Sequence, residues 1–187
     1  MGALGVDEVI VAPEDGSARR TAPAETQAFL ALSETLAKAP GRAVQRLVDL
    51  AMKLTGADSA GVSLEEEGGE PIFRWIATAG EFSRYLGGTM PRHFSPCGTV
   101  VDRGRTLVMR DPARAFPYVA ELHAPVCAVL LVPFTKGGRY VGTVWVAAHQ
   151  PQKQFTSEDV QMVERLTTFS TSILDALRPP RGKPAAA

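Results

Sequence analysis

Cys97 is the residue of this chain whose type and position best suit covalent chemistry. Ser95 followed by Pro96 is typical of a helix cap and a first helical position, so Cys97 is expected in the first turn, where the helix dipole lowers the pKa of a thiol. A reactive or redox role is therefore open to Cys97. The alternative of a small buried filler is favoured, because free cysteines are commonly structural, and Cys127, which begins an apolar run, is also interpreted as filler.

Histidines and arginines offer a second kind of chemistry, the binding of a metal, a haem or an anion. His93, His123 and His149 stand apart, with no second ligand three or four residues away, so their spacing argues against a metal or haem site. Arg92 and His93, together with Arg110, could instead meet the carboxylate of a ligand at the mouth of a cavity. Simple solvation is the alternative for such side chains in loops.

Three aromatic residues with polar tips, Trp75, Tyr118 and Trp145, suit the wall of a half-wet pocket. Core packing explains the two tryptophans equally well. These residue types do not name the ligand. The residues expected to contact an unidentified small molecule are Trp75, Arg92, His93, Ser95, Cys97, Tyr118 and His123.

These candidates fall mostly in two stretches without regular periodicity, residues 80–94 and 111–126. The two stretches flank a predicted short helix, residues 95–104, and a short strand, residues 106–109. Loops of this length are uncommon in compact domains unless they serve a ligand. We therefore predict that these segments wall a binding site.

The elements that position this site are arranged around a predicted hairpin over residues 127–150. Residues 127–134 form a nearly continuous apolar run, as in a strand that is buried on both faces. Two glycines can make the tight turn, and residues 140–148 return as a second strand in which Gly142 leaves room for a close neighbour. The other predicted elements are helices over residues 21–39, 44–56 and 157–177 and strands over residues 60–64 and 72–79.

The whole chain is expected to form one domain, residues 21–178, between a flexible N-terminal segment, residues 1–20, and a disordered tail, residues 179–187. Twenty basic and 20 acidic residues give a net charge of zero, which removes the electrostatic argument for nucleic acid or a membrane as partner. The N-terminus lacks the pattern of a signal peptide, and the two cysteines form no close pair, so we expect a cytoplasmic location.

The order of these elements resembles that of the GAF domain family over about residues 26–177. Residues 94–103 look like the corresponding segment of GAF domains in bacterial two-component sensor proteins. Such GAF domains often precede a histidine kinase. The other segments that carry the resemblance are residues 57–63 (Ala-Asp-Ser-Ala-Gly-Val-Ser), 131–134 (Leu-Val-Pro-Phe), 141–145 (Val-Gly-Thr-Val-Trp) and 155–159 (Phe-Thr-Ser-Glu-Asp).

The resemblance implies an α+β fold. A central antiparallel sheet of five to six strands would carry the terminal helices on one face and a loop-walled ligand cavity on the other. It also implies a small-molecule sensory or regulatory module in bacterial signal transduction, with a histidine kinase or another signalling protein as partner. A homodimer through the terminal helices is expected, and the apolar residues that could form its seam are Phe29, Leu32, Leu36, Phe169, Ile173, Leu174 and Leu177.

Activities known in the family supply the alternatives. A free methionine sulfoxide reductase has this fold, and Cys97 resembles one of its partner cysteines, but residues 121–123, where its catalytic cysteine would fall, contain no thiol. A covalent bilin would need a cysteine where Leu122 precedes His123, and a cyclic nucleotide site would need an Asn-Lys pair at residues 149–150. We therefore expect no catalysis and no covalent bilin, and we retain a Cys97 redox sensor or enzyme and a ligand-free dimerisation module as alternatives.

Overall fold

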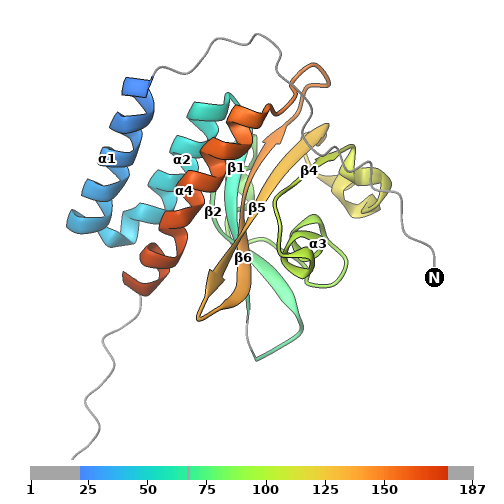
Figure 1. The fold of residues 1–187 in the computed structure, drawn as a ribbon. Helices are drawn as coiled ribbons and strands as arrows, with labels where there is room; N and C mark the ends of the chain where they lie inside the picture. The colour runs from blue at the N-terminus through green and yellow to red at the C-terminus, as the bar shows by residue number, and fades with distance from the viewer. Residues whose placement is uncertain (1–21, 67, 177–187) are drawn as a thin grey trace, which may run out of the picture.

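The computed structural model describes residues 22–66 and 68–176, and they form the expected α+β arrangement (Figure 1). The predicted flexible segment, residues 1–20, and the predicted tail, residues 179–187, lie outside the described residues. Thr21, expected to cap the first helix, and Leu177, expected in a dimer seam, lie outside them as well.

One antiparallel sheet of six strands forms the centre of the molecule, in the order β3-β2-β1-β6-β5-β4. The predicted hairpin is β5 and β6, and its turn holds Gly137 and Gly138 at positive φ. β5 pairs with a strand on either side, and β6 pairs with β1 at the middle of the sheet. The strands are β1 (Ser59–Glu65), β2 (Ile72–Gly80), β3 (Thr89–Pro91), β4 (Leu107–Arg110), β5 (Ala128–Lys136) and β6 (Arg139–Ala148).

Three long helices, α1 (Ala22–Lys38), α2 (Ala43–Thr55) and α4 (Ser157–Ala176), lie on one side of the sheet (Figure 1). α2 ends at Gly56, which takes the left-handed conformation at φ 61°. At the start of α4, the Asp159 N–H donates to Thr156 Oγ1 at 3.2 Å, and the Thr156 N–H donates to Asp159 Oδ2 at 2.8 Å. This reciprocal pair satisfies free backbone donors at the start of the helix, as the sequence predicts.

The alternation of side chains along β5 and β6 explains why both strands are so apolar. Leu130 and Val146 belong to the core under the helices, whereas Leu131 and Trp145 belong to a second core on the opposite face. Successive strand residues point to opposite faces of a sheet, so a strand covered on both faces needs apolar residues throughout. The continuous apolar run of β5 thus reflects its contribution to two cores, one on each face of the sheet.

The opposite side of the sheet is covered by short elements. They are α3 (Pro96–Arg103), η2 (Glu81–Tyr85), η3 (Pro112–Arg114) and η4 (Pro117–Glu121), of which the last three are 3₁₀ helices. The expectation that residues 80–94 and 111–126 lack regular structure is therefore wrong in detail, because η2, β3, η3 and η4 lie there. Elements of three to five residues are too short to leave a periodic pattern in the sequence.

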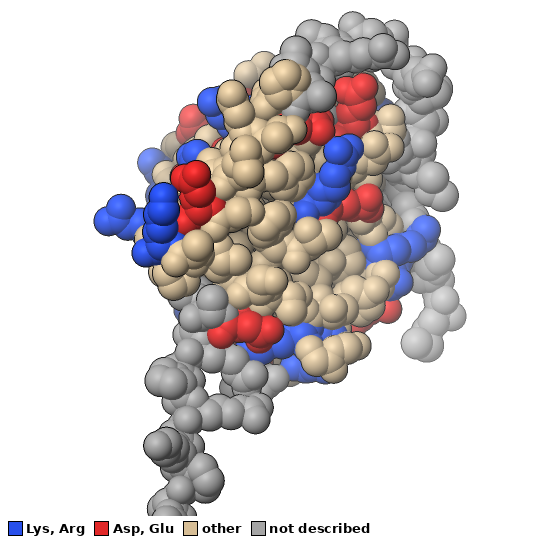
Figure 2. All heavy atoms as spheres, turned by 60° about the vertical axis from the view of Figure 1, so that its left-hand side comes forward, with Lys and Arg blue, Asp and Glu red and all other residues tan. Residues whose placement is uncertain are grey.

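α1 contacts α2 and α4, outside the layer that α2 and α4 form on the sheet. The rings of Phe29 and Phe169 stack with centroids 5.9 Å apart, and Leu32 and Ile173 are fully buried within the chain. Much of the apolar surface expected in a dimer seam is thus covered by the chain's own helices. Figure 2 shows the face where α1 comes forward, mostly uncharged with charges of both signs around it, and on α1 Leu30 is 59% exposed.

Within residues 22–66 and 68–176, no helix combines the length and the apolar character that crossing a bilayer requires.

Replacing Gly142 with alanine should destabilise the domain. A Cβ atom at this position would collide with the Ser63 carbonyl oxygen and the Phe134 ring, as expected for a glycine that permits a close approach. Such overpacking costs about 1–3 kcal/mol, measurable by urea unfolding followed by circular dichroism. Gly69→Ala is the control, because a Cβ there meets no atom within 4 Å. Equal stability of the two variants would contradict the packing described.

Candidate functional site

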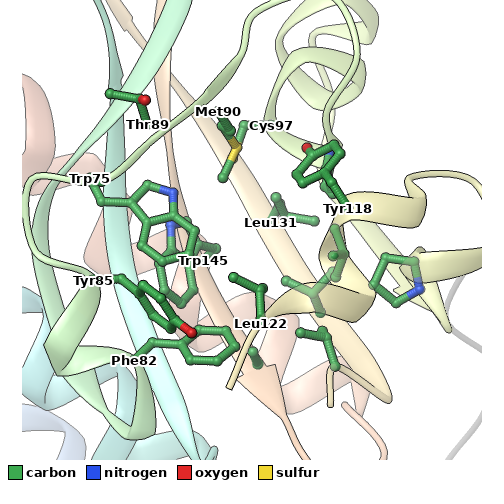
Figure 3. Close-up of a pocket in the computed structure, with 17 residues that line it drawn as sticks. Trp75, Phe82, Tyr85, Thr89, Met90, Cys97, Tyr118, Leu122, Leu131 and Trp145 are labelled. Carbon is green, nitrogen blue, oxygen red and sulfur yellow. The ribbon is translucent and has the colours of Figure 1, made fainter. Parts of the chain in front are cut away.

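A cavity of about 130 Å³ lies between the sheet and the short elements that cover its second face (Figure 3). Its floor comes from the sheet: Trp75 of β2, Val129 and Leu131 of β5, and Trp145 and Ala147 of β6. The floor residues of β5 and β6 are two apart in sequence, so they point to the same face. The strand pairing that builds the sheet therefore also builds the floor.

The walls come from the segments that the sequence assigns to a binding site. Phe82 and Tyr85 come from η2, Cys97 from α3, and Tyr118 and Val119 from η4. Phe82 and Tyr85 were not predicted as site residues, although their spacing of three places both on one side of a 3₁₀ turn. The other wall residues are Gly88, Thr89, Met90, Pro96, Pro112, Leu122 and Val126.

Aromatic rings pack together at one end of the cavity. The Trp75 ring lies 5.1 Å from that of Trp145, 5.9 Å from that of Phe82 and 5.8 Å from that of Tyr85, centroid to centroid. Trp145 Nε1 also donates a hydrogen bond to Ser63 Oγ at 3.0 Å. These contacts hold the four rings in defined positions and make this end of the cavity rigid and apolar.

Two polar atoms of the lining have no partner. Trp75 Nε1 and the Tyr118 hydroxyl are buried and form no hydrogen bond within the described residues. A buried donor without a partner costs about 1–3 kcal/mol. By contrast, the Tyr85 hydroxyl accepts a hydrogen bond from the His123 N–H at 2.7 Å.

Cys97 lies in the cavity wall but not in a setting that activates a thiol. The residue is 2% exposed, Thr143 Oγ1 donates to its Sγ at 3.2 Å, and its thiol is 3.5 Å from Ser63 Oγ. Burial raises the pKa of the Cys97 thiol above its ordinary value, against the expected lowering by the helix dipole. The dipole argument fails here because desolvation of the thiolate outweighs it.

Of the predicted site residues, the structure brings Trp75, Cys97 and Tyr118 together in the cavity lining. His93 and His123 have exposed side chains, and neither lines the cavity. Ser95 is buried, but its Oγ caps α3 by accepting a hydrogen bond from the Gly98 N–H at 3.0 Å, so it does not face a ligand.

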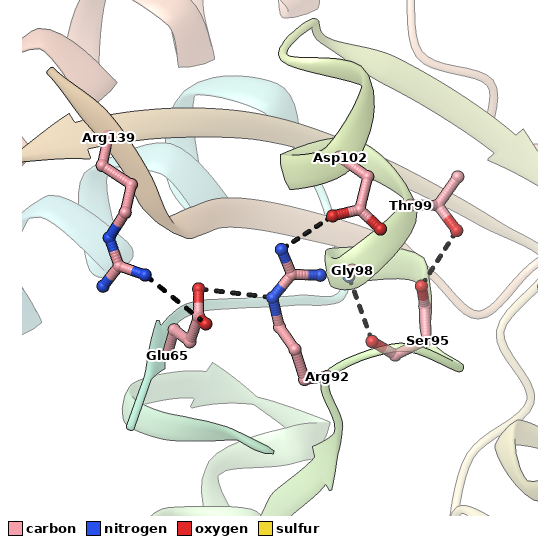
Figure 4. A network of polar contacts seen from close by, with 7 residues as sticks. All are labelled: Glu65, Arg92, Ser95, Gly98, Thr99, Asp102 and Arg139. Atoms are coloured by element: carbon pink, nitrogen blue, oxygen red, sulfur yellow. Dashed lines mark hydrogen bonds and ion pairs between the residues drawn. The ribbon is translucent and has the colours of Figure 1, made fainter. Parts of the chain in front are cut away.

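Arg92 is also buried away from the cavity, in an ion-pair network (Figure 4). Its Nη2 donates to Asp102 Oδ1 at 2.7 Å, its Nε lies 3.3 Å from Glu65 Oε2, and its guanidinium lies over the Phe73 ring. Arg110, the other arginine expected at the cavity mouth, donates to the Gln154 side chain. Neither arginine lines the cavity, so their expected role in binding a carboxylate at its mouth stays a prediction.

The Arg92 network joins elements that are distant in sequence. Glu65 ends β1, Arg92 follows β3, Asp102 lies in α3, and Arg139, which begins β6, lies 3.8 Å from Glu65 Oε1. The network thus anchors α3, and with it the cavity wall, to the sheet. In the part of the chain that the structure describes, no group of three or more His, Cys, Asp or Glu side chains is arranged to hold a metal ion.

Comparison with solved structures identifies the same architecture at low sequence identity. The GAF domain of a phosphoenolpyruvate-protein phosphotransferase from Acinetobacter matches with a TM-score of 0.70 and 13% identity, over 86% of this chain and 99% of that chain. The free methionine-R-sulfoxide reductase from Neisseria meningitidis matches with a TM-score of 0.68 and 16% identity, over 86% and 93% of the two chains. The second GAF domain of DevS from Mycobacterium smegmatis matches with a TM-score of 0.59 and 15% identity, over 73% of this chain and 94% of that chain.

These identities are low, so the similarity shows the fold and no shared ligand or reaction. No curated protein matches the sequence. The family model described as GAF domain matches residues 37–175, which span the elements from the end of α1 to the end of α4. This match agrees with the observed fold, a six-stranded sheet covered on both faces. The chain therefore belongs to the GAF domain family.

Proposed function

We propose that this GAF domain is a sensory or regulatory module of bacterial signal transduction that binds a small molecule in the cavity over the sheet. The observation that carries the proposal is the cavity itself, of about 130 Å³, with an apolar lining and two unpartnered polar atoms. Ligand sites commonly combine apolar walls with a few polar groups that orient the ligand. The matched structures named above come from bacterial proteins, which supports the bacterial context.

The path from the cavity to a partner protein runs through the sheet. Leu131 lines the cavity, whereas its neighbours Leu130 and Val132 pack in the core under the helices. α4 contacts β5, and Thr171 Oγ1 donates to the Thr135 carbonyl oxygen at 2.6 Å. A ligand that shifts β5 would therefore shift α4, and we propose that a histidine kinase or another signalling protein reads this change at the terminal helices.

Filling the cavity should abolish binding. Ala147→Leu adds three carbon atoms to the cavity floor, whereas Ala120→Leu adds them to an exposed position of η4. We expect mass spectrometry of organic extracts to detect a small molecule in the purified wild-type protein and in Ala120→Leu, and to detect little or none in Ala147→Leu. Circular dichroism confirms that each variant is folded. A compound retained equally by all three proteins would show that the cavity is not its site.

We also propose that the domain is not an enzyme, despite its structural similarity to a methionine sulfoxide reductase. The Cys97 thiol is buried and its pKa is raised, so little thiolate forms near neutral pH. Residues 121–123 provide no second thiol. A redox sensor or reductase based on Cys97 is therefore the less favoured function.

Cys97 should react slowly with a thiol reagent in the folded protein at pH 8 and rapidly in urea. Folding raises the pKa of the Cys97 thiol. The stabilisation that depends on the protonated thiol is therefore fully present below the pKa of the unfolded state, and it is lost as the pH rises through the pKa of the folded state. Wild-type stability should thus fall relative to Cys97→Ser at alkaline pH, as measured by urea titration. Cys127→Ser isolates the Cys97 signal in the reagent assay.

Reductant-dependent turnover of free methionine sulfoxide that is lost in Cys97→Ser would refute the non-enzymatic proposal.

We propose self-association through the terminal helices, with Leu30 in the seam because Leu32 and Ile173 are buried within one chain. Leu30→Glu should convert a dimer to a monomer in sedimentation while circular dichroism shows that the domain stays folded, because Leu30 is exposed in the single chain. Ala24→Glu, at another exposed position of α1, is the control. Wild-type protein that sediments as a monomer well above micromolar concentration would contradict self-association.

A further inference from the structure

The polar atoms of the cavity restrict the chemistry of its ligand, given the proposed function that the cavity is a ligand site. Trp75 and Trp145 are neighbouring indoles in the same lining, but their donors differ. Trp145 Nε1 donates to Ser63 Oγ at 3.0 Å, whereas Trp75 Nε1 is buried without an acceptor. The free donor of Trp75 calls for an acceptor that the described residues do not supply.

The position of the Trp75 indole is set by its surroundings. The residue is 7% exposed, and its ring is held by Phe82, Tyr85 and Trp145. Its backbone is also fixed, because the Trp75 N–H donates to the Gly88 carbonyl oxygen and its carbonyl accepts from the Gly87 N–H, both at 2.9 Å. The indole therefore cannot readily turn to find another acceptor, and its N–H is a preformed donor.

The Tyr118 hydroxyl is a second buried group without a partner. Figure 3 shows Tyr118 and Trp75 on either side of Cys97 in this view of the cavity. Burial, with a smaller contribution from the neighbouring Cys97, raises the pKa of the Tyr118 phenol, so the phenol keeps its proton. Tyr118 therefore offers a donor as well as an acceptor.

Charge is the property that the cavity lacks. The lining, as described by the structure, contains no charged side chain, and Arg92 is paired with Glu65 and Asp102 outside it. An anion would lose its hydration in this cavity without gaining a counter-charge. The aromatic rings could attract a cation, but the free indole N–H directs its positive end toward an acceptor and so favours a neutral ligand.

The size of the cavity points to a small ring. A cavity of about 150 Å³ lined by Leu, Ile and Phe is known to accept benzene, and the cavity here measures about 130 Å³. We propose that it binds an uncharged, mainly apolar compound with a single aromatic ring, whose acceptor atom receives a hydrogen bond from Trp75 Nε1, with Tyr118 as a second polar contact.

Four probes of similar size test this proposal. Acetophenone is neutral and carries an acceptor, isopropylbenzene is neutral without a hydrogen-bonding oxygen or nitrogen, benzoate is an anion, and phenyltrimethylammonium is a cation. The chain has two tryptophans, so the indole region of a ¹⁵N–¹H correlation spectrum should hold two signals, assigned with Trp75→Phe. Each probe is titrated into the full chain, and the Trp145 indole, which already has an acceptor, serves as the internal reference.

We expect acetophenone to bind most tightly and to move the Trp75 indole proton downfield, with a smaller change at Trp145. Trp75→Phe should weaken acetophenone binding roughly 3- to 10-fold more than it weakens isopropylbenzene binding, because both probes lose packing against the indole but only acetophenone loses a hydrogen bond. Tyr118→Phe, which keeps the ring, should lower acetophenone binding by a similar or smaller factor. The spectra of both variants report directly whether the fold is retained.

Benzoate or phenyltrimethylammonium binding as tightly as acetophenone would overturn the assigned ligand chemistry. So would an equal loss of acetophenone and isopropylbenzene binding in Trp75→Phe, because that result would show packing without a hydrogen bond. In both cases the cavity would remain a ligand site, and the proposed function would stand. Failure of all four probes to bind would overturn the ligand chemistry, whereas the proposed function would be overturned if extracts of the wild-type protein also contained no bound small molecule.

Discussion

The pairing of β1 with β6 is the interaction on which the rest of this domain depends. It joins the β1–β2 hairpin, which ends at Gly80, to the β5–β6 hairpin, which begins only at Ala128, and it places Gly61 opposite Trp145. A Cβ atom at Gly61 would collide with the Trp145 ring, so the glycine makes room for the indole. Ser63, two residues along the same strand face, accepts the hydrogen bond of that indole. The register of this one strand pair therefore fixes the floor of the cavity.

The two faces of the sheet have different roles in the domain. One face packs on α2 and α4, and the other carries the cavity, so the same strands contribute to both cores. Protein cores are packed so closely that a displacement of side chains on one side of a strand also displaces the residues packed on its other side. This shared sheet is the physical basis for the proposed communication between a ligand and the helices.

The cavity wall is held by polar contacts rather than by the apolar cores alone. Arg92 joins β1 to α3 through Glu65 and Asp102, while the Ser95 cap fixes the start of α3. Gly98 also lies so close to the Arg92 carbonyl oxygen that a side chain could not fit between them. Residues that look like ligand contacts in the sequence thus serve to position the wall. Their charges are used within the protein, which leaves the cavity itself uncharged.

Local patterns in the sequence determined the larger elements and the family. Apolar residues at helical spacing predict α2 and α4, the apolar run from Cys127 predicts β5, and the glycine pair predicts the turn before β6, because each signal depends on near neighbours in the chain. The short helices η2, η3 and η4 escaped prediction because three to five residues leave no periodic signal.

The tertiary structure alone decided which candidate residues meet in the site. Trp75, Cys97 and Tyr118 meet because α3 and η4 wall the cavity over the sheet face that carries Trp75. Arg92, by contrast, is held in an ion-pair network by partners 27 residues before it and ten after it. Whether Cys97 is activated was likewise decided by burial, which outweighs the helix dipole. Burial and hydrogen-bond partners are set by distant segments, and for that reason the sequence around each residue could not reveal them.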